Sequence, residues 1–348
     1  MSDLLLAGLD IGGTKTLAVA VSVPAATVAG APAVVEGSIV ATVRRATRGG
    51  PEEVRTSVAE TLADLAAAAG VPVTGFAAVG MGIPGLVDRE AGTVRHAVNL
   101  GLGEEPLALA DHVGDLARAP VVVDNDVNVA AVGAASALRC PGDLAYLSVG
   151  TGVAAGFVLG GRIRQGAHGA AGEIGHLPAD PSGPLCDCGQ RGCLEAVASG
   201  TAIAKRWPSA GGAASAASAL LAAAASGDGV AAEVRDEVAA YLAGAVALIA
   251  QTVDPQIIVL GGGVAEAGGP LLDAVVDALH ARAERSPVLA ALDLAGRVAL
   301  VPEGVPAGAL GAALLARAHL AADSARIAAD SAGDGLRGRT TETRRATM

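Results

Sequence analysis

The sequence predicts an α/β protein of two domains with a cleft between them, and three observations lead to that prediction. The chain has 348 residues, 52% hydrophobic and 17% charged, enough to bury a large core and to divide into two domains. Strand-like segments alternate with helix-like segments, as in α/β architectures. Two strand ends carry similar glycine turns, Asp10-Ile11-Gly12-Gly13-Thr14 and Ser148-Val149-Gly150-Thr151-Gly152, a faint repeat that suggests two like domains sharing the cleft.

Three strands are expected before the first helix, because aliphatic and β-branched residues dominate each one and glycine turns or a Pro/Ala-rich connection separate them. The first helix begins with proline and acidic residues and ends at Gly70, as helix ends prefer. The expected elements of this half are strands over 4–10, 16–23 and 36–43, a helix over 51–69, strands over 76–81 and 121–124, and a helix over 126–138.

The second half begins with a strand over 144–149 that opens another strand-rich region. The alanine-, glycine- and serine-rich stretch over 209–227 predicts a loop followed by a plain surface helix. A long helix over 230–253, a buried strand over 257–260 and a last helix over 307–320 are expected after it. The segment over 321–348 is polar and weakly periodic, so a disordered tail without a function is expected there.

Charge and composition exclude several classes of partner. The formal net charge of −11 argues against a nucleic-acid partner, because phosphate backbones bind basic surfaces. An uncharged stretch over 17–35 is interrupted by Pro24, Gly30 and Pro32, so no membrane span is expected. No basic leader with a small-residue cleavage site opens the chain. A cytoplasmic protein follows, in which the four cysteines are thiols or metal ligands.

The first glycine turn predicts a phosphate site. Gly12 and Gly13 stand between two strands, where consecutive backbone N–H groups can converge on an anion, and Thr14 and Lys15 add further donors. Asp10, at the end of the strand, could hold Mg²⁺ through water. The alternative is a plain hairpin turn preceded by an acidic residue.

Two further glycine loops favour the phosphate interpretation. Gly150-Thr151-Gly152 and Gly261-Gly262-Gly263 each follow an apolar strand. Three such loops at strand ends suit a nucleotide that lies across a cleft, with the first two loops on its phosphates and the third against its adenosine.

A polar triplet, Asp124-Asn125-Asp126, stands where an apolar strand ends and a helix begins. Either aspartate could cap the helix by accepting backbone N–H groups. Either could also serve phosphoryl transfer, which needs one carboxylate to accept the proton of the attacking hydroxyl, donors for the phosphate oxygens, and close alignment. Position alone leaves capping and catalysis open for both residues.

The most specific local pattern is a cluster of three cysteines and one histidine. Cys186, Cys188 and Cys193 lie within eight residues, and His176 precedes the first of them by ten. Three thiolates and one imidazole complete a tetrahedral Zn²⁺ shell, and a closed shell is structural rather than catalytic. The alternative is three buried thiols, since the spacing differs from the paired C-x₂-C of zinc fingers.

Zinc at this cluster would also order its neighbours. It would tie the loop over 181–192 to the segment that holds Glu173, and it would fix Glu195, two residues after the last cysteine. Without a metal, both glutamates would be interpreted as surface charges. Cys140 is far away in the sequence and is expected to be an ordinary buried thiol.

Together these segments resemble the ROK family of sugar kinases and repressors, and specifically its glucokinase-like kinases. The resemblance runs from about residue 4 to residue 320, and a set of motifs in this order is very specific. The motifs are 8–16 (GLDIGGTKT), 80–85 (GMGIPG), 124–126 (DND), the stretch from 147 to EIGH at 173–176, 186–195 (CDCGQRGCLE) and 308–311 (GALG).

The resemblance implies an actin-like ATPase fold, in which two ribonuclease H-like domains close around a sugar and ATP. It implies an N-terminal domain over 1–124 plus 305–320 and a C-terminal domain with the zinc loop over 125–304. It makes Asp126 the catalytic base and His176 both a zinc ligand and a sugar contact. The side chains that it places on sugar hydroxyls are Asn99, Asn125, Glu173, His176 and Glu195. ATP with Mg²⁺, a structural Zn²⁺ and a homodimer or homotetramer complete what it implies.

Two departures from the family pattern concern the site. The usual glycines after Gly-Thr-Gly-Val are Ala154 and Ala155 here, which bears on how closely a phosphate can approach. Many members carry a tryptophan after Asn99-Leu100, where this chain has Gly101-Leu102, and that bears on the face against which the sugar packs.

The expected activity is the glycolytic phosphorylation of glucose to glucose 6-phosphate, and N-acetylmannosamine, fructose and allose are the alternative sugars. A repressor of this family would carry a DNA-binding helix-turn-helix ahead of the sugar site, but the first phosphate turn is already complete by Thr16. An actin-like ATPase without a sugar substrate would have no use for the Cys/His cluster and its neighbouring glutamates.

Overall fold

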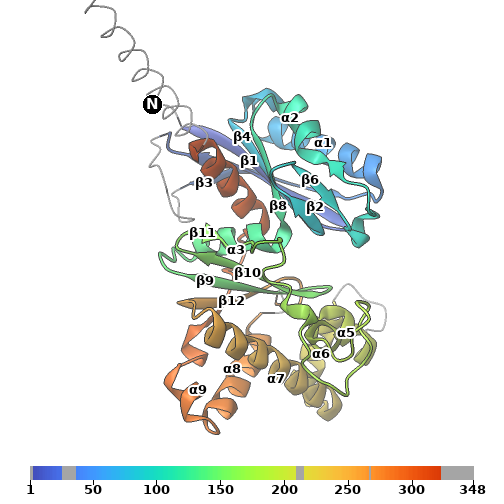
Figure 1. Ribbon diagram of the computed structural model, residues 1–348, viewed down its shortest axis with the longest axis vertical. Helices are drawn as coiled ribbons and strands as arrows, with labels where there is room; N and C mark the ends of the chain where they lie inside the picture. The colour runs from blue at the N-terminus through green and yellow to red at the C-terminus, as the bar shows by residue number, and fades with distance from the viewer. Residues whose placement is uncertain (1–2, 26–36, 209–214, 266–267, 323–348) are drawn as a thin grey trace, which may run out of the picture. The chain divides into compact units, whose positions relative to one another are not determined.

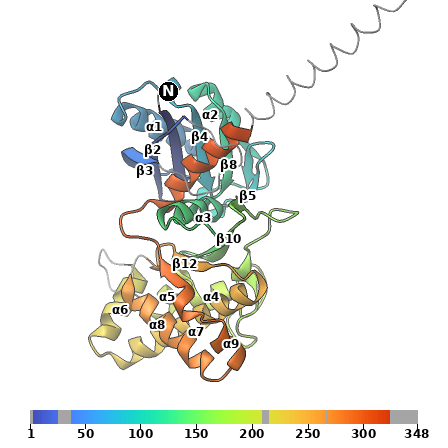
Figure 2. The same cartoon turned by 90° about the vertical axis from the view of Figure 1, so that its left-hand side faces the viewer.

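The computed structural model describes residues 3–25, 37–208, 215–265 and 268–322 (Figures 1 and 2). The chain divides into two compact units, unit 1 up to Asp124 and again from Ala312, and unit 2 from Asn125 to Gly311. Each unit is built on its own five-stranded sheet with helices, so the predicted α/β class is confirmed. The domain limits stay a prediction, and the expected disordered tail lies outside the described residues from 323 onward.

The sheet of unit 1 has the strand order β3-β2-β1-β4-β8. Its first three strands form an antiparallel meander, and β1 also pairs in parallel with β4. The strands are β1 (Leu4–Ile11), β2 (Lys15–Val23), β3 (Ser38–Ala46), β4 (Ala78–Ile83) and β8 (Val121–Asn125). These bounds confirm the five strands expected here to within a few residues.

Helices cover both faces of this sheet (Figure 1). α1 (Pro51–Ala68) has proline and two glutamates in its first turn, as its sequence predicts, and buries Val58 and Leu62 in one core with Leu9 of the sheet. α2 (Leu109–Ala117) joins the same core. On the opposite face runs the helix over 307–322, whose backbone approaches β4 so closely that a Cβ on Gly80 would overlap the carbonyl oxygen of Ala312.

A small antiparallel sheet, in the order β5-β6-β7, completes unit 1. Its strands are β5 (Leu86–Asp88), β6 (Thr93–Arg95) and β7 (Leu107–Ala108), and the 3₁₀ turn η2 (Val98–Leu100) lies between the last two. None of these elements was predicted, because strands of two or three residues are too short to show alternation.

The sheet of unit 2 has the order β11-β10-β9-β12-β13. Again the first three strands form an antiparallel meander, and the first of them, β9, pairs in parallel with the fourth, β12. The strands are β9 (Leu144–Val149), β10 (Val153–Leu159), β11 (Arg162–Ile163), β12 (Ile257–Gly261) and β13 (Val298–Leu300). Both sheets thus have the same strand order, and both glycine turns join first and second strands. The faint repeat of sequence is a repeat of structure.

The helices of unit 2 lie on both sides of its sheet (Figures 1 and 2). α3 (Asp126–Ala137) packs on β9 and β10, and the other helices gather around α7 on the opposite side. They are α4 (Leu194–Ala198), α5 (Gly200–Arg206), α6 (Ala216–Ala225), α7 (Gly229–Thr252), α8 (Gly269–Ala283) and α9 (Pro287–Ala291). No helix of the described residues is both long and apolar enough to cross a membrane.

One expectation is wrong. The stretch over 209–227 does end in a helix, but α6 is not a plain surface helix, since it buries Ala217, Leu220, Leu221 and Ala224 in the core of unit 2. Alanine contrasts little with its neighbours in hydrophobicity, so an alanine-rich helix hides which of its faces is buried. The loop expected before it lies largely in residues 209–214, outside the described part of the chain.

Candidate functional site

A polar group marks the start of α3. Asn125 is the N-cap, because its Oδ1 accepts the Val127 N–H at 2.9 Å, and Asp126 Oδ1 shares that N–H at 3.0 Å. Asp124 is buried and forms a 3.4 Å ion pair with Arg89. The capping role that the sequence offered to an aspartate therefore falls chiefly to the asparagine between the two.

The carboxyl of Asp126 is tuned by its surroundings. Burial raises its pKa from 3.8 to about 6, against the lowering effect of hydrogen bonds from the N–H groups of Val127 and of Asp126 itself. The negative charge of Glu173 contributes a smaller part of this rise, so the two carboxylates act on each other. Near neutral pH such a group is still ionised and is a stronger base than an ordinary aspartate.

Glu173, His176 and Glu195 are brought to one region by two segments that flank the start of β10. The 3₁₀ turn η3 (Ile174–His176) follows Glu173, and a Cβ on Gly175 would lie 3.5 Å from the Cβ of Glu195. Glu195 is the second residue of α4, and its Oε2 accepts the Val153 N–H at 3.0 Å. The segments that carry these three predicted sugar contacts are therefore neighbours in unit 2.

The four predicted metal ligands converge. One ligand atom from each of His176, Cys186, Cys188 and Cys193 can be chosen so that all lie within 4.8 Å of one another. The Cys186 Sγ is 3.8 Å from the His176 Nδ1, and the Cys188 Sγ is 3.6 Å from the Cys193 Sγ. Tetrahedral zinc bonds of 2.0–2.3 Å separate their ligand atoms by roughly 3.5–3.8 Å. The cluster is therefore compatible with zinc.

Electrostatics also favour a cation at this cluster. Burial, with smaller contributions from the neighbouring thiols Cys188 and Cys186, raises the pKa of the Cys193 thiol to about 12. Hydrogen bonding, first from the Gln190 backbone, lowers the pKa of Cys188 to about 7. Three thiols this close cannot all ionise without a positive charge between them, and thiolates are the form that binds metal.

The turn Gly150-Thr151-Gly152 presents backbone N–H groups. Gly150 O accepts the Gly200 N–H at 2.7 Å and Thr151 O accepts the Thr201 hydroxyl at 2.8 Å, so both carbonyls point toward the start of α5. The described peptide bonds are all trans, and in a trans peptide the N–H points away from the carbonyl. The N–H groups of Thr151 and Gly152, which no described residue accepts, therefore point away from α5 and suit an anion.

The residues at the start of α5 were missed by the sequence analysis. Ser199 caps the helix by accepting the Ala202 N–H, and the next two residues, Gly200 and Thr201, hold the carbonyls of the turn. A run of small polar residues before a helix could have indicated this contact, but it is a common pattern with many uses.

The third glycine loop lies beside the second. The Val264 N–H donates to Val149 O at 2.8 Å, and a Cβ on Gly150 would be 3.9 Å from the Gly263 nitrogen. The two loops predicted to bind a nucleotide in unit 2, Gly150-Thr151-Gly152 and Gly261-Gly262-Gly263, are thus adjacent.

The first glycine turn, in unit 1, is a closed hairpin. The Gly12 N–H donates to Lys15 O at 2.9 Å, and Thr14 and Lys15 are exposed. Gly13 packs against Asn99, since a Cβ on Gly13 would stand 2.9 Å from both the Cβ and the carbonyl oxygen of Asn99. Unit 1 therefore carries Asp10, this turn and Asn99, and the other predicted site residues belong to unit 2.

The two departures from the family pattern have a structural account. The Ala155 side chain is buried in the hydrophobic core of unit 2, so this methyl group faces away from the turn, while Ala154 is partly exposed. Gly101 has a φ of +66°, and a Cβ there would lie 3.1 Å from the Gly50 nitrogen. A tryptophan at position 101 would be strained in this left-handed backbone conformation.

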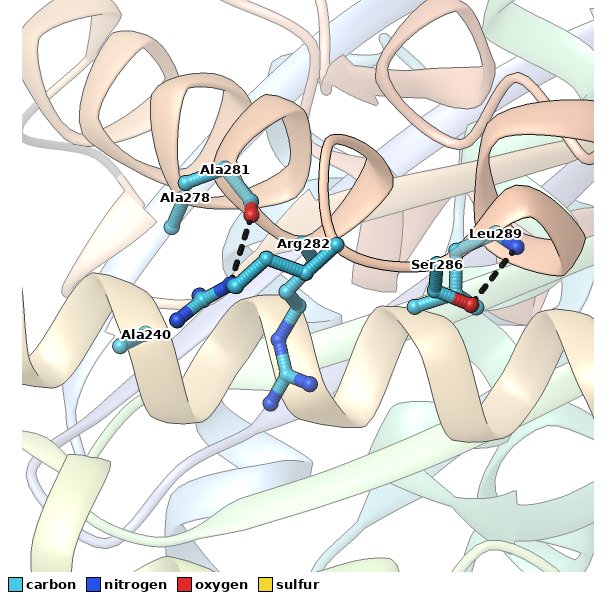
Figure 3. Close-up of a pocket in the computed structure, with 7 residues that line it drawn as sticks. Ala240, Ala278, Ala281, Arg282, Ser286 and Leu289 are labelled. Atoms are coloured by element: carbon cyan, nitrogen blue, oxygen red, sulfur yellow. Dashed lines mark hydrogen bonds between the residues drawn. The ribbon is translucent and has the colours of Figure 1, made fainter.

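A cavity of about 510 Å³ lies elsewhere in unit 2, among α7, α8 and α9 (Figure 3). Figure 3 shows the side chain of Arg282 here, and Arg285 Nε donates to Ala281 O at 3.0 Å. None of the predicted site residues lines this cavity, so it is not the candidate site.

The model of the ROK family matches residues 6–319. A glucokinase of Halalkalibacterium halodurans is 34% identical over 293 residues, 78% of this chain and 84% of that protein. An N-acetylmannosamine kinase of Escherichia coli is 37% identical over 225 residues, 64% of this chain and 73% of that protein.

Solved structures agree with the family match. A ROK hexokinase from Thermus thermophilus has a TM-score of 0.71 at 30% identity and covers 91% of this chain and 99% of its own. A ROK glucokinase from Streptomyces griseus, in complex with glucose and AMPPNP, has a TM-score of 0.68 at 31% identity and covers 90% and 99%. The likeness extends over nearly all of this chain.

Proposed function

Because the chain belongs to the ROK family, we propose that it transfers the terminal phosphoryl group of ATP to a hydroxyl of glucose and forms glucose 6-phosphate. The observation that supports this most directly is the environment of Asp126. Its carboxyl has a pKa of about 6 and stands near Glu173. The anion-binding turn Gly150-Thr151-Gly152 belongs to the same unit.

In this proposal Asp126 accepts the proton of the sugar hydroxyl as the hydroxyl oxygen attacks the γ-phosphorus. The new O–P bond forms while the bond to the β-phosphate oxygen breaks, and ADP leaves. The N–H groups of Thr151 and Gly152 donate to phosphate oxygens, and the Gly12-Gly13 turn with Lys15 supplies further donors. Mg²⁺ would neutralise phosphate charge, and Asp10 would hold it through water.

The sugar would be held by polar side chains whose remaining groups suit hydroxyls. The His176 Nδ1 faces the Cys186 thiol at 3.8 Å, so Nε2 is the atom available to a hydroxyl. Asn125 uses its Oδ1 as a cap, and its side-chain amide is also proposed to contact a sugar hydroxyl. The residues proposed to bind the sugar are Asn99, Asn125, Glu173, His176 and Glu195.

Zn²⁺ would have a structural role here, bound by His176, Cys186, Cys188 and Cys193. All four ligand positions would come from the protein, which leaves none for a substrate. The metal would join η3 to α4 and so fix the two segments that carry Glu173 and Glu195. A dimer or tetramer and a cytoplasmic location stay expectations.

N-acetylmannosamine is the second candidate substrate, because a relative with that activity in its name is 37% identical over 225 residues. A coupled ADP-release assay over glucose, N-acetylmannosamine, fructose and allose separates the candidates. The highest kcat/KM is expected for glucose, with little ADP release when sugar is omitted. Equal release with and without sugar would contradict a sugar kinase and would indicate an ATPase.

A further inference from the structure

We propose that Glu195 is also a positioning residue for the phosphate-binding turn, so that the Cys/His cluster supports nucleotide binding as well as sugar binding. This inference rests on the proposed function, because it assigns the turn Gly150-Thr151-Gly152 to phosphate. It concerns a contact within unit 2 alone.

Glu195 contacts the C-terminal end of the turn, at Gly152 and Val153. Its Oε2 accepts the Val153 N–H at 3.0 Å, directly after the turn. The same oxygen lies against Gly152, where a Cβ would overlap it. At the first end of the turn, Val149 O accepts the Val264 N–H at 2.8 Å. Both ends of the turn are therefore held by residues from outside the hairpin.

The contact with Glu195 completes the control of the peptide planes in the turn. The start of α5 holds the carbonyls of Gly150 and Thr151, and Glu195 holds the N–H of Val153. The two carbonyl contacts fix the direction of the Thr151 and Gly152 N–H groups, and Glu195 fixes the next peptide plane, that of Gly152 and Val153, which anchors the end of the turn. Hydrogen bonds weaken steeply as the donor angle falls, so a turn released at one end would hold phosphate less well.

The cluster in turn holds Glu195. Cys193 is fully buried and is the N-cap residue of α4, two positions before Glu195. The Leu194 N–H donates to Leu177 O at 2.9 Å, directly after His176. α4 has five residues, too few to be stable as an isolated helix, so its position depends on such tertiary contacts. A metal bound by His176 and Cys193 would therefore also fix Glu195.

Substitutions of Glu195 can separate the effect of its side-chain length from the effect of its charge. Glu195→Gln keeps an oxygen at the same distance for the Val153 N–H but loses the charge. Glu195→Asp keeps the charge but is one methylene shorter, and Glu195→Ala loses both. A positioning role predicts that the glutamine variant binds nucleotide within about three-fold of wild type, whereas the aspartate and alanine variants bind roughly ten-fold more weakly.

The measurement is the Kd of AMPPNP with Mg²⁺ by calorimetry, without sugar, so that no sugar contact contributes. The amide chemical shifts of Thr151 and Gly152 give a second readout. Relative to wild type, they should change in the aspartate and alanine variants and remain the same in the glutamine variant. Removal of the metal by a chelator, with metal content measured, should weaken AMPPNP binding by a similar factor.

The outcomes are distinct. If wild type binds AMPPNP and all three variants match it, Glu195 does not position the turn. If the glutamine variant weakens as much as the alanine variant, charge and not reach is responsible, and the inference is wrong. If wild type fails to bind AMPPNP at all, the proposed function itself fails. If the alanine variant does not fold, the aspartate and glutamine variants still decide the question.

Discussion

Gly13 lies against Asn99 so closely that a Cβ on Gly13 would stand 2.9 Å from the Asn99 Cβ. The two residues are far apart in the sequence, yet the hairpin of β1 and β2 and the 3₁₀ turn η2 bring them together within unit 1. One residue belongs to the turn proposed to bind phosphate, and the other is a proposed sugar contact. A substitution at either residue should therefore change the KM values for both the sugar and ATP.

Gly13→Ala is expected to push Asn99 and the turn apart. Because the added methyl group meets both a side-chain and a backbone atom, stability should fall by about 1–3 kcal/mol. The KM values for glucose and ATP should both rise, by roughly ten-fold. Gly49→Ala is the matched control, since its nearest neighbour, Leu100 O, would be 3.6 Å from the new Cβ. Steady-state kinetics and thermal unfolding check both variants, and unchanged KM values in Gly13→Ala would contradict this account.

Asp126→Asn should remove the base while keeping the fold. The asparagine retains an oxygen for the Val127 N–H, which Asp126 Oδ1 accepts at 3.0 Å. We expect kcat to fall by roughly 10²–10⁴-fold with little change in glucose affinity. Asp111→Asn, in the first turn of α2 and exposed, is the control and should keep normal kcat. A kcat near wild type in the Asp126 variant would exclude this residue as the base.

Activity should depend on pH through the same carboxyl. Since burial raises the pKa of Asp126 to about 6, kcat/KM should fall below about pH 6 as the base takes up its proton. Glu303→Gln, which removes an exposed carboxylate elsewhere in the chain, is the control and should show the same pH profile as wild type. An acid limb that persists unchanged in Asp126→Asn, measured on its residual activity, would assign it to another group.

Stability should show the opposite trend with pH. The folded state binds the Asp126 proton more tightly than the unfolded chain does, so wild type loses stability as pH rises from about 4 to about 6. Asp126→Asn has no proton to lose, and it should be more stable than wild type at pH 7.5, by up to about 3 kcal/mol, but not at pH 3.5. Urea unfolding at both pH values measures the difference. Equal stability of wild type and Asp126→Asn at pH 7.5 would mean that burial does not destabilise the ionised carboxylate.

Cys188→Ser should lose the metal. Elemental analysis of pure wild-type protein should find about one zinc per chain, and the variant much less, with glucose affinity reduced as η3 and α4 loosen. Cys140→Ser is the control, because Cys140 stands outside the cluster, with its Sγ 3.7 Å from Gly142 O. Wild-type protein without zinc would show that the cluster is only a group of thiols.

Features set by neighbours along the chain were predictable. The ends of α1 follow from its first-turn proline and glutamates and from Gly70, and all four cluster residues fall within 18 positions, 176 to 193, so their spacing carries the signal. The like glycine turns also predicted two like units, and the common strand order bears that out.

Features set by tertiary contact were not predictable. Nothing near Gly13 in the sequence indicates Asn99, and nothing near Glu195 indicates Val153. The sequence could not show that Asn125 is the N-cap of α3, because Asp124, Asn125 and Asp126 can all accept a backbone N–H. In α6 the buried face includes both of its leucines and packs on α7, but the alanines around them mark that face only weakly in the sequence.

The return of the chain to unit 1 at Ala312 has a consequence during translation. β4 leaves the ribosome long before the helix that covers Gly80 has been made, and proteins begin to fold from their N-terminal end. A nascent chain must therefore keep one face of its first sheet out of contact with other apolar surfaces until residues 312–322 have been made. Fragments that stop before residue 312 should aggregate, even though they contain every strand of that sheet.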